Sequence, residues 1–345
     1  MSDKRVTISD IARESGASPT TVSLVLRDKG GIGTETRERV LAAAQTLGYE
    51  RKATRREPID PQWTVALLFR AHSPYPEGGA NGVNPFYSWV LTGVEAMARA
   101  RRINLLYGTI TIDDSNRMTD IPYHLLKQDL DGVILVGAFG DAEVEALIPN
   151  AAYPLVVVDG PGPSSRHDAV SSNNVGGAKM ATEHLIAAGH SRIGLITRPG
   201  QHNPNFFARE QGYREAMATS GLTPVVAQIA AWNVAAAVSD LLEREPALTA
   251  IFCVNDQFAL DAFHALGQRG VTVPTGISLV GFDNTDHANA MRPNLTTMHV
   301  DKVSMGRFAI TLLDQRLQWP DAAPATVVLA PRLILRGSVG PPRTL

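Results

Sequence analysis

The hydrophobic and polar positions of residues 6–49 form three short amphipathic segments, each preceded by a residue suited to begin a helix. Ser9 is the expected N-cap of the first, because a serine side chain accepts a hydrogen bond from the first helical turn. Ser18 followed by Pro19 predicts the second, since proline at the first helical position loses no backbone hydrogen bond. Thr34 begins the third. The expected inward positions of the third segment are Val40, Leu41, Ala44 and Leu47, with Gly48 at its end.

Beyond residue 62 the pattern changes to short runs of Val, Ile and Leu that alternate with helical periodicity. Continuous apolar runs separated by helices indicate buried parallel strands joined by right-handed crossovers. The predicted strands cover residues 64–69, 103–107, 132–136, 155–159, 192–197, 250–254 and 278–282. The predicted helices cover residues 87–101, 141–148, 175–188, 209–220, 234–243 and 257–269. This length of alternating α/β sequence predicts two lobes, each with a parallel sheet, rather than one sheet.

Composition adds one asymmetry to this division. The chain has 345 residues, of which 44% are apolar and 19% charged, as is typical of a globular protein, and its net charge is −2. Residues 1–60 alone carry eleven Lys and Arg against nine Asp and Glu, so the basic charge accompanies the three-helix segment. Directly after that segment, a predicted linker carries the cations Arg51, Lys52, Arg55 and Arg56.

Several classes of protein are excluded by the residues present. Cys253 is the single cysteine, so we expect neither an internal disulfide nor a thiolate metal site. The nine histidines show no ligand spacing, and phosphate loop, dinucleotide fingerprint and nucleophile elbow are all missing, so we expect no metal, no cofactor and no catalysis. The sequence has no long apolar run and no secretory leader pattern, which favours a cytoplasmic protein without membrane contact.

The first two segments, joined by a tight turn at residues 16–17, form a candidate helix-turn-helix. The second helix of such a unit enters the major groove of DNA with its N-terminal residues, here Pro19 and Thr20, nearest the bases. Thr21 and Ser23 are placed to reach phosphates. Spacing alone leaves open a small helical bundle that has no role in DNA binding.

The same positions resemble a known family. ISDIA at residues 8–12, GASPTTVS at 16–23, TRERV at 36–40 and LGY at 47–49 match, without gaps, the N-terminal domain of the lactose-repressor (LacI/GalR) family. LILRGS at 333–338 is similar to the usual end of the family, so the resemblance covers nearly the whole chain. It implies a homodimeric transcription regulator, usually a repressor, that binds a palindromic operator in double-stranded DNA and responds to a small effector. It also implies an α/β core of two lobes similar to periplasmic sugar-binding proteins of type I.

The resemblance implies a division of the chain. Residues 1–49 are the expected helix-turn-helix head and 50–62 the hinge. The first lobe is expected to hold residues 63–172 with 301–327, and the second lobe 173–300 with 328–345. No helix pattern follows residue 336, so we expect a dimer rather than a tetramer joined by a terminal helix.

Two positions depart from the family pattern. Most relatives carry a basic residue where this chain has Leu24, and a leucine that wedges into the minor groove where it has Pro58. Leu24 therefore implies either a changed base preference at that position or a residue that is only helix surface, and the sequence leaves open whether the hinge forms a helix. The candidate DNA-binding residues are Ser9, Ser18, Pro19, Thr20, Thr21, Ser23, Leu24, Arg51, Lys52, Arg55, Arg56 and Pro58.

Ligands of two-lobed α/β proteins bind outside the carboxyl ends of the strands, which nominates residues at those ends. Asp159, Asn255 and Asp283 lie there, and their side chains form hydrogen bonds with hydroxyl groups. The resemblance places a ligand-gripping arginine at Arg209 and an aromatic wall at Trp232. The candidate effector-binding residues are Phe86, Asp159, Asn203, Asn205, Arg209, Trp232, Asn255 and Asp283, a set that favours a sugar or polyol.

Each candidate has a structural alternative. An aspartate at a strand end often caps the next helix, as we expect of Asp256, while Trp232 and Phe86 suit the core and Arg209 a surface ion pair. Two other functions are the alternatives. The head and the missing leader argue against a secreted sugar-binding protein, and the missing nucleophile argues against an enzyme that acts on a sugar. The sequence leaves open the identity of the effector, whether it induces or corepresses, the operator and the regulated genes.

Overall fold

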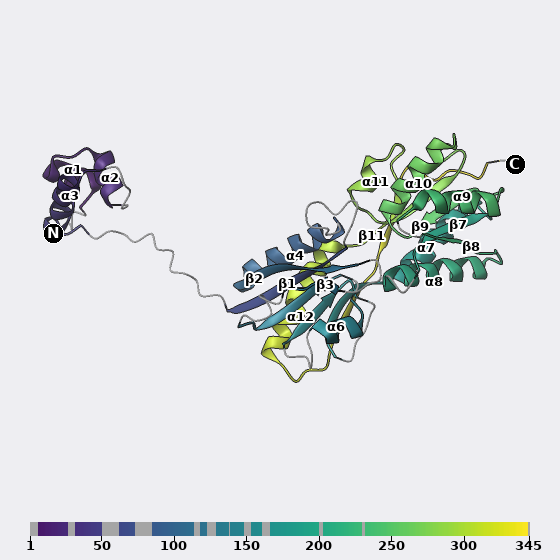
Figure 1. Ribbon diagram of the computed structural model, residues 1–345, viewed down its shortest axis with the longest axis horizontal. Helices are drawn as coiled ribbons and strands as arrows, with labels where there is room; N and C mark the ends of the chain where they lie inside the picture. Colours follow the sequence, from purple (N-terminus) through teal and green to yellow (C-terminus); the bar gives the residue numbers. More distant parts are fainter. Residues whose placement is uncertain are drawn as a thin grey trace. The chain divides into compact units, whose positions relative to one another are not determined.

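The computed structural model describes residues 6–26, 32–49, 62–72, 85–113, 118–122, 129–137, 139–147, 153–160, 166–199, 203–229 and 232–343. The chain forms two compact units, Met1–Asp60 and Pro61–Leu345 (Figure 1). The predicted hinge residues Arg51, Lys52, Arg55, Arg56 and Pro58 lie outside the described residues.

The first unit contains three helices, α1 (Ile8–Ser15), α2 (Pro19–Leu26) and α3 (Thr34–Thr46). Their apolar faces meet in a small core in which Ile11, Val22 and Val40 are fully buried. The expectation that Leu41 points inward is wrong, since its side chain is 47% exposed and Ala43 is buried instead. Successive helical residues lie roughly 100° apart, so burial of Val40 turns its neighbour outward.

The start of α1 also differs from the expectation. Thr7, not Ser9, is the N-cap, because the Thr7 side chain accepts from the backbone N–H of Asp10 while the Asp10 carboxylate accepts from the Thr7 N–H at 2.9 Å. This is a capping box, whose Thr-x-x-Asp spacing is present in the sequence. At α2 the expected cap is confirmed, with Ser18 Oγ accepting from the N–H of Thr21 at 3.1 Å. The tight turn between them contains Gly16 with φ of +63°, a left-handed conformation that suits glycine.

A seven-stranded sheet forms the first lobe, in the order β12-β6-β5-β4-β1-β2-β3. Its strand pairs are parallel except for β2 with β3. The strands are β1 (Trp63–His72), β2 (Ile103–Ile112), β3 (Met118–Asp120), β4 (Gly132–Val136), β5 (Leu155–Val158), β6 (Asp168–Ser172) and β12 (Thr326–Leu329). The associated helices are α4 (Phe86–Arg101), α6 (Asp141–Leu147) and α12 (Lys302–Gln318).

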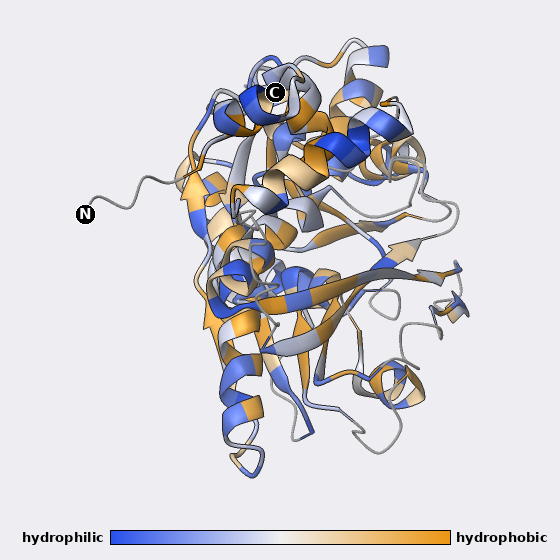
Figure 2. Ribbon diagram, turned by 90° about the vertical axis from the view of Figure 1, so that its left-hand side faces the viewer, coloured by the Kyte–Doolittle hydropathy of each residue, from blue (hydrophilic) through white to orange (hydrophobic). Residues whose placement is uncertain are grey.

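A six-stranded sheet forms the second lobe, in the order β13-β11-β10-β9-β7-β8. The strands are β7 (Ile193–Thr197), β8 (Val225–Gln228), β9 (Ala250–Cys253), β10 (Ser278–Asp283), β11 (Thr296–His299) and β13 (Arg332–Ile334). The helices are α7 (Asn174–Ala187), α8 (Pro204–Thr219), α9 (Val234–Arg244), α10 (Asp256–Gln268) and α11 (Asp286–Ala290). Figure 2 shows strands in which hydrophobic residues predominate beside helices that mix hydrophilic and hydrophobic residues.

The chain passes between the two sheets three times, after β6, after β11 and after β12. Each of the seven predicted strands is present. Six of them are apolar runs buried on both faces of a parallel sheet, whereas β2 exposes part of its length. The short strands β3, β6, β8, β11, β12 and β13 were not predicted. β3, β6 and β11 contain many polar residues, and β8, β12 and β13 are only three or four residues long. Helix α8 begins at Pro204 rather than at Arg209, with Asn203 as its N-cap and proline in its first turn.

Two glycines bring α4 and α12 into backbone contact. A Cβ added to Gly93 would collide with the carbonyl oxygen of Val303, and one added to Gly306 would collide with that of Val90. The two helices therefore form one closely packed pair on the first sheet.

We expect Gly93→Ala to lower the free energy of unfolding by about 3 kcal/mol, because the helices have to separate. Gly267→Ala is the matched control, since a Cβ at this position of α10 meets nothing within 4 Å and alanine favours helix by up to about 1 kcal/mol. Urea unfolding followed by tryptophan fluorescence measures the free energy of unfolding of both variants, since the four tryptophans all lie in the second unit. Equal stability of the two variants would contradict the close contact.

Candidate functional site

The carboxyl ends of the strands carry unusual backbone conformations. Asp159 after β5, Asp283 at the end of β10 and the following Asn284 have φ of +64°, +104° and +52°, and Trp232 has φ of +62°. Residues other than glycine rarely adopt this left-handed backbone conformation, and the residues that do are concentrated at functional sites. Three of the four were candidate effector residues, so local strain and sequence position indicate the same region.

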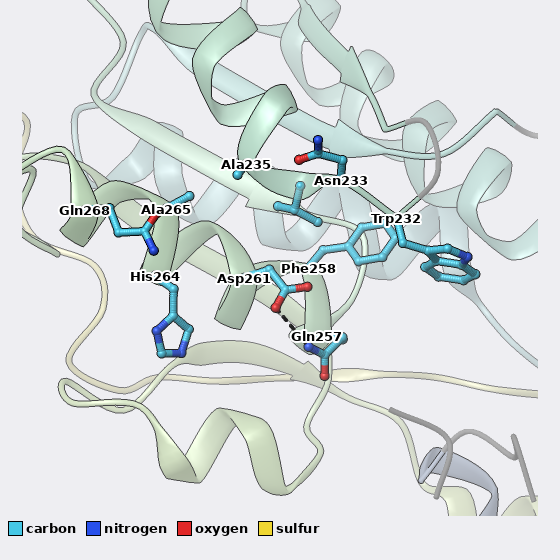
Figure 3. A pocket seen from close by; sticks show the side chains of 10 residues that line it. Trp232, Asn233, Ala235, Gln257, Phe258, Asp261, His264, Ala265 and Gln268 are labelled. Atoms are coloured by element: carbon cyan, nitrogen blue, oxygen red, sulfur yellow. Dashed lines mark hydrogen bonds between the residues drawn. The ribbon is translucent and has the colours of Figure 1, made fainter. Parts of the chain in front are cut away.

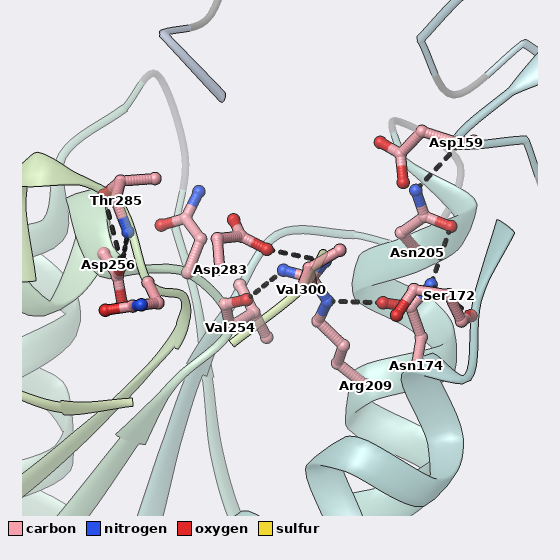
Figure 4. Close-up of polar contacts among 12 residues, drawn as sticks. Asp159, Ser172, Asn174, Asn205, Arg209, Val254, Asp256, Asp283, Thr285 and Val300 are labelled. Carbon is pink, nitrogen blue, oxygen red and sulfur yellow. Dashed lines mark hydrogen bonds and ion pairs between the residues drawn. The ribbon is translucent and has the colours of Figure 1, made fainter. Parts of the chain in front are cut away.

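Arg209 reaches this region because α7 and α8 touch. A Cβ on Gly212 of α8 would collide with the carbonyl oxygen of Val175 in α7, which brings Asn174, the first residue of α7, beside Arg209. The Arg209 Nε donates to Asn174 Oδ1 at 2.8 Å (Figure 4). The alternative of a surface ion pair is therefore wrong, since Arg209 is only 3% exposed.

The guanidinium of Arg209 is held on four sides. Besides Asn174, its Nη1 donates to the Val254 carbonyl at 2.7 Å, and its Nη2 lies 3.0 Å from Oδ1 of Asp283. Its central carbon lies 3.8 Å from the centroid of the Phe282 ring. A planar fork fixed in this way is preorganised to bind adjacent hydroxyls or a carboxylate with its remaining N–H groups.

A second set of contacts joins the two lobes. Asn205 of α8 donates from Nδ2 to the Asp159 carbonyl at 3.0 Å, and its Oδ1 accepts from Asn174 Nδ2 at 3.1 Å. The Tyr87 hydroxyl of α4 donates to Asp159 Oδ2 at 2.9 Å. Arg209, Asn174, Asn205 and Asp159 thus form one chain of hydrogen bonds that crosses from the second lobe to the first. Together with Tyr87, Asp256, Asp283 and Lys302 at the neighbouring strand and helix ends, they form the polar cluster.

Two polar candidates serve local structure as well. The side chains of Asn203 and Asn255 accept backbone N–H groups as the N-caps of α8 and α10. Asp256, which we expected to cap α10, is instead 1% exposed; its Oδ2 accepts from the Thr285 N–H at 2.6 Å and its Oδ1 from the Thr297 hydroxyl at 2.5 Å. Because Asn255 supplies the cap, Asp256 is available to join the ends of α10, β10 and β11.

The two aromatic candidates lie in different surroundings. Phe86, the first residue of α4, is 4% exposed. Trp232 is half-buried, has the Arg198 guanidinium 4.0 Å over its ring and packs edge-on against Phe258. A pocket of about 370 Å³ lies beside Trp232, between the start of α9 and α10 (Figure 3). Its lining includes Asp261, His264 and Gln268 but neither Arg209 nor Asp283, so this hollow is separate from the polar cluster.

Burial alters the acids of the cluster. It raises the pKa of Asp159 to about 7, although Arg209 opposes the shift, and Asp283 adds to it. Burial, with a further contribution from Asp283, also raises the pKa of Asp256 to about 7. These carboxyls therefore change charge near neutral pH.

A pH dependence of stability follows from these raised values. Between about pH 4 and 7 the folded protein holds protons on Asp159 and Asp256 that the unfolded chain has released, so the free energy of unfolding falls as pH rises through this window. We expect the urea midpoint to decrease from pH 5 to pH 8, and Asp256→Asn to make that decrease shallower. Asp240→Asn, at an exposed carboxylate, is the control and should leave the slope unchanged. An unchanged slope in Asp256→Asn would contradict the assignment.

Several residues of the cluster were not found from the sequence. Tyr87, Asn174 and Lys302 enter it from the starts of three helices, and the Lys302 ammonium donates to the Asp283 carbonyl at 2.5 Å. The buried hydroxyl of Ser172, at the end of β6, has no hydrogen-bond partner among the described residues. A search for polar residues at helix starts beside strand ends would have found Asn174. Tyr87 depends on the packing of α4 on the first sheet, and Lys302 on a contact across the lobes.

Most candidate DNA-binding residues of the head lie on α2 or directly before it. Ser18, Pro19 and Thr20 are exposed at the N-terminal end of this helix, whereas Thr21, Ser23 and Leu24 are half-buried. The Thr21 hydroxyl hydrogen-bonds with Ser18 Oγ at 2.8 Å. Ser9 is exposed on α1. The exposed N-terminus of α2 has the geometry of a recognition helix.

Two absences hold for the described residues alone. Within them, no group of three or more His, Cys, Asp and Glu side chains is arranged to hold a metal ion. Across the same ranges, every helix is too short or too polar to span a membrane.

Comparison with known proteins defines the class. Residues 7–52 match the model of bacterial regulatory proteins of the lacI family, and residues 182–339 match a periplasmic binding protein-like domain. The ribose operon repressor of Haemophilus influenzae is 31% identical over 341 residues, covering 96% of this chain and 98% of that protein. The transcriptional repressor PurR of Photobacterium profundum is 29% identical over 342 residues, with the same two shares.

A solved structure indicates the same class of protein. The transcriptional regulator CelR in complex with cellobiose is 28% identical, with a TM-score of 0.68, over 97% of this chain and 100% of that one. Fold, head and polar cluster thus define a DNA-binding transcription regulator with an effector-binding core. The chain belongs to the lacI family of bacterial regulatory proteins. Its relatives are regulators rather than enzymes.

Proposed function

We propose that the protein is a cytoplasmic, non-catalytic repressor that binds a palindromic operator as a homodimer and is released by a sugar or polyol. The observation that carries this proposal is the preorganised Arg209, which contacts Asn174, Val254 and Asp283 at the strand ends of the second lobe. A palindromic operator suits two identical heads, because half-sites lie about one helical turn apart.

In the head, we assign base contacts to Pro19, Thr20 and Leu24 of α2, and phosphate contacts to Ser9, Ser18, Thr21 and Ser23. Leu24 offers no hydrogen bond, so it suits the methyl group of a thymine. The segment 50–62 is the proposed hinge, where Arg51, Lys52, Arg55 and Arg56 neutralise phosphates and Pro58 or its neighbour enters the minor groove.

In the core, the proposed effector contacts are the eight candidate residues together with Tyr87 and Asn174. Alternating carboxylates, amides and one fixed guanidinium match the hydroxyl pattern of a sugar, and Phe86 and Trp232 supply apolar walls. A ribose operon repressor among the relatives and the cellobiose complex of CelR support this class. The PurR relatives make a purine the alternative.

The proposed mechanism uses the hydrogen-bond chain between the lobes. An effector at Arg209 competes with Asn174, whose side chain also holds Asn205, and Asn205 in turn bonds the Asp159 carbonyl. Binding therefore changes the relation of the two lobes. If this change is transmitted to the hinge, a coupling of about 1–3 kcal/mol is sufficient to change operator occupancy strongly. Either sign of response, induction or corepression, is compatible with these contacts.

Selection of random double-stranded DNA by the full chain tests the proposal. We expect enrichment of a palindrome with half-sites about one helical turn apart, with binding that weakens steeply as salt increases. The selected sequence is then mixed with D-ribose, D-cellobiose or hypoxanthine, and operator affinity is measured by fluorescence anisotropy. Binding without sequence enrichment or salt dependence would refute the regulator, whereas a response to hypoxanthine alone would replace the sugar by a purine.

A further inference from the structure

Lys302 occupies a position that is unusual for a cation. It is the first residue of α12 and only 5% exposed, so its ammonium is both desolvated and at the positive end of the helix dipole. Burial lowers the pKa of this amine. Three carbonyl oxygens surround it, those of Asp283 at 2.5 Å, Val300 at 3.2 Å and Asn284 at 3.3 Å. All three donors of an ammonium are thus directed at backbone oxygens.

Two of these oxygens belong to the left-handed pair Asp283 and Asn284. Such a backbone persists only where its surroundings hold it. The Asn284 side chain is held as well, because its Oδ1 accepts from Arg336 at 2.7 Å and its Nδ2 lies 3.0 Å from Nδ1 of His299. The conformation of this pair determines where the Asp283 carboxylate meets Arg209.

The other end of Lys302 belongs to the first lobe. Helix α12 packs against α4 through Gly93 and Gly306, so the two helices behave as one body. Phe86, the first residue of α4, has its ring centroid 5.4 Å from the Lys302 ammonium. Lys302 therefore connects the α4–α12 pair of the first lobe to the strand end of the second lobe that carries Asp283.

We propose that Lys302 is a positioning residue for effector recognition: it holds the Asp283–Asn284 turn so that the Asp283 carboxylate faces Arg209, and it ties that turn to α4 and α12. The proposal rests on the proposed function for the identity of the site, and it requires no contact between Lys302 and the effector. It adds a route by which occupation of Arg209 and Asp283 alters the first-lobe helices.

Hydrogen–deuterium exchange of the full, ligand-free chain tests the positioning directly. We expect Lys302→Met to accelerate exchange in residues 283–288 by about ten-fold or more, with α1–α3 and β7 unchanged. Lys302→Arg, which keeps a cation, should restore most of the protection. Lys179→Met is the matched control, since Lys179 lies 40% exposed on α7. Unchanged exchange of residues 283–288 in Lys302→Met would overturn the proposal, as would faster exchange spread evenly over the second lobe.

A double-mutant cycle with D-ribose as the probe separates positioning from general stability. Lys302→Met should weaken D-ribose binding by about ten-fold in the wild-type background and by much less beside Asp283→Asn, because the carboxylate it positions is then absent. Equal effects in both backgrounds would overturn the proposal. Failure of D-ribose to bind the wild type counts against a ribose effector and leaves the exchange result to decide the role of Lys302.

Discussion

Replacement of Arg209 by methionine is expected to abolish the thermal stabilisation that a bound sugar gives the wild-type protein. Arg209 supplies N–H groups on a fork fixed by Asn174, Val254 and Asp283, and methionine supplies none. The variant also leaves the 7% exposed Asp283 carboxylate without its guanidinium, which costs about 3–5 kcal/mol for a buried pair, so its ligand-free melting temperature should fall. Loss of two charge-assisted hydrogen bonds to the effector corresponds to at least a 100-fold weaker affinity.

The measurement is a thermal-shift titration with D-ribose, D-cellobiose and hypoxanthine. Arg192→Met is the matched control, because Arg192 is 54% exposed in its ion pair with Glu245 and should bind sugar as the wild type does. Arg209→Lys keeps a buried cation without the planar fork, so it folds more readily and should still lose about ten-fold in affinity. A sugar that stabilises the wild type and Arg209→Met equally would remove Arg209 from the effector site.

Val22→Asn is expected to abolish operator binding while sugar binding by the core persists. Val22 is fully buried in the head, where an unpaired amide and lost packing together cost roughly 3–5 kcal/mol. A head of this size has little stability to lose, so it should unfold. Because the head and core are separate compact units, the core should keep its melting transition.

Leu41→Asn makes the comparison specific, since it places the same side chain in the same head at a position that is 47% exposed. We expect operator affinity, measured by fluorescence anisotropy, to fall by more than about 100-fold for Val22→Asn and by less than about three-fold for Leu41→Asn. Retained operator binding by Val22→Asn would locate the DNA-binding surface outside the head.

The elements that the sequence predicted correctly are those whose signal is local. Apolar runs such as residues 132–136 became strands with the predicted bounds, because burial on both faces requires uninterrupted apolar residues. Asp159 and Asp283 were found by the rule that ligands meet strand ends, and both lie in the polar cluster. Ser9 and Asp256 were misassigned for a local reason, since Thr7 with Asp10 and Asn255 are the better caps.

The remainder of the site depends on contacts between distant parts of the chain. Asn174 meets Arg209 only because Gly212 lets α7 and α8 touch, and Tyr87 meets Asp159 only because α4 covers the first sheet. A buried lysine at the start of a helix, such as Lys302, contradicts simple helix rules, and two of its carbonyl partners, Asp283 and Asn284, lie in the other lobe. These relations have no periodic signature in the sequence.

If one chain couples operator DNA to a small effector, each ligand has to change the affinity of the other by the same factor. Operator affinity is measured with and without saturating D-ribose, or with whichever panel sugar binds, and the affinity of that sugar is measured with and without the selected operator. Thermodynamic linkage requires the two ratios to be equal, and we expect both to be about five-fold or more. Binding of both ligands with neither affecting the other would refute the coupling.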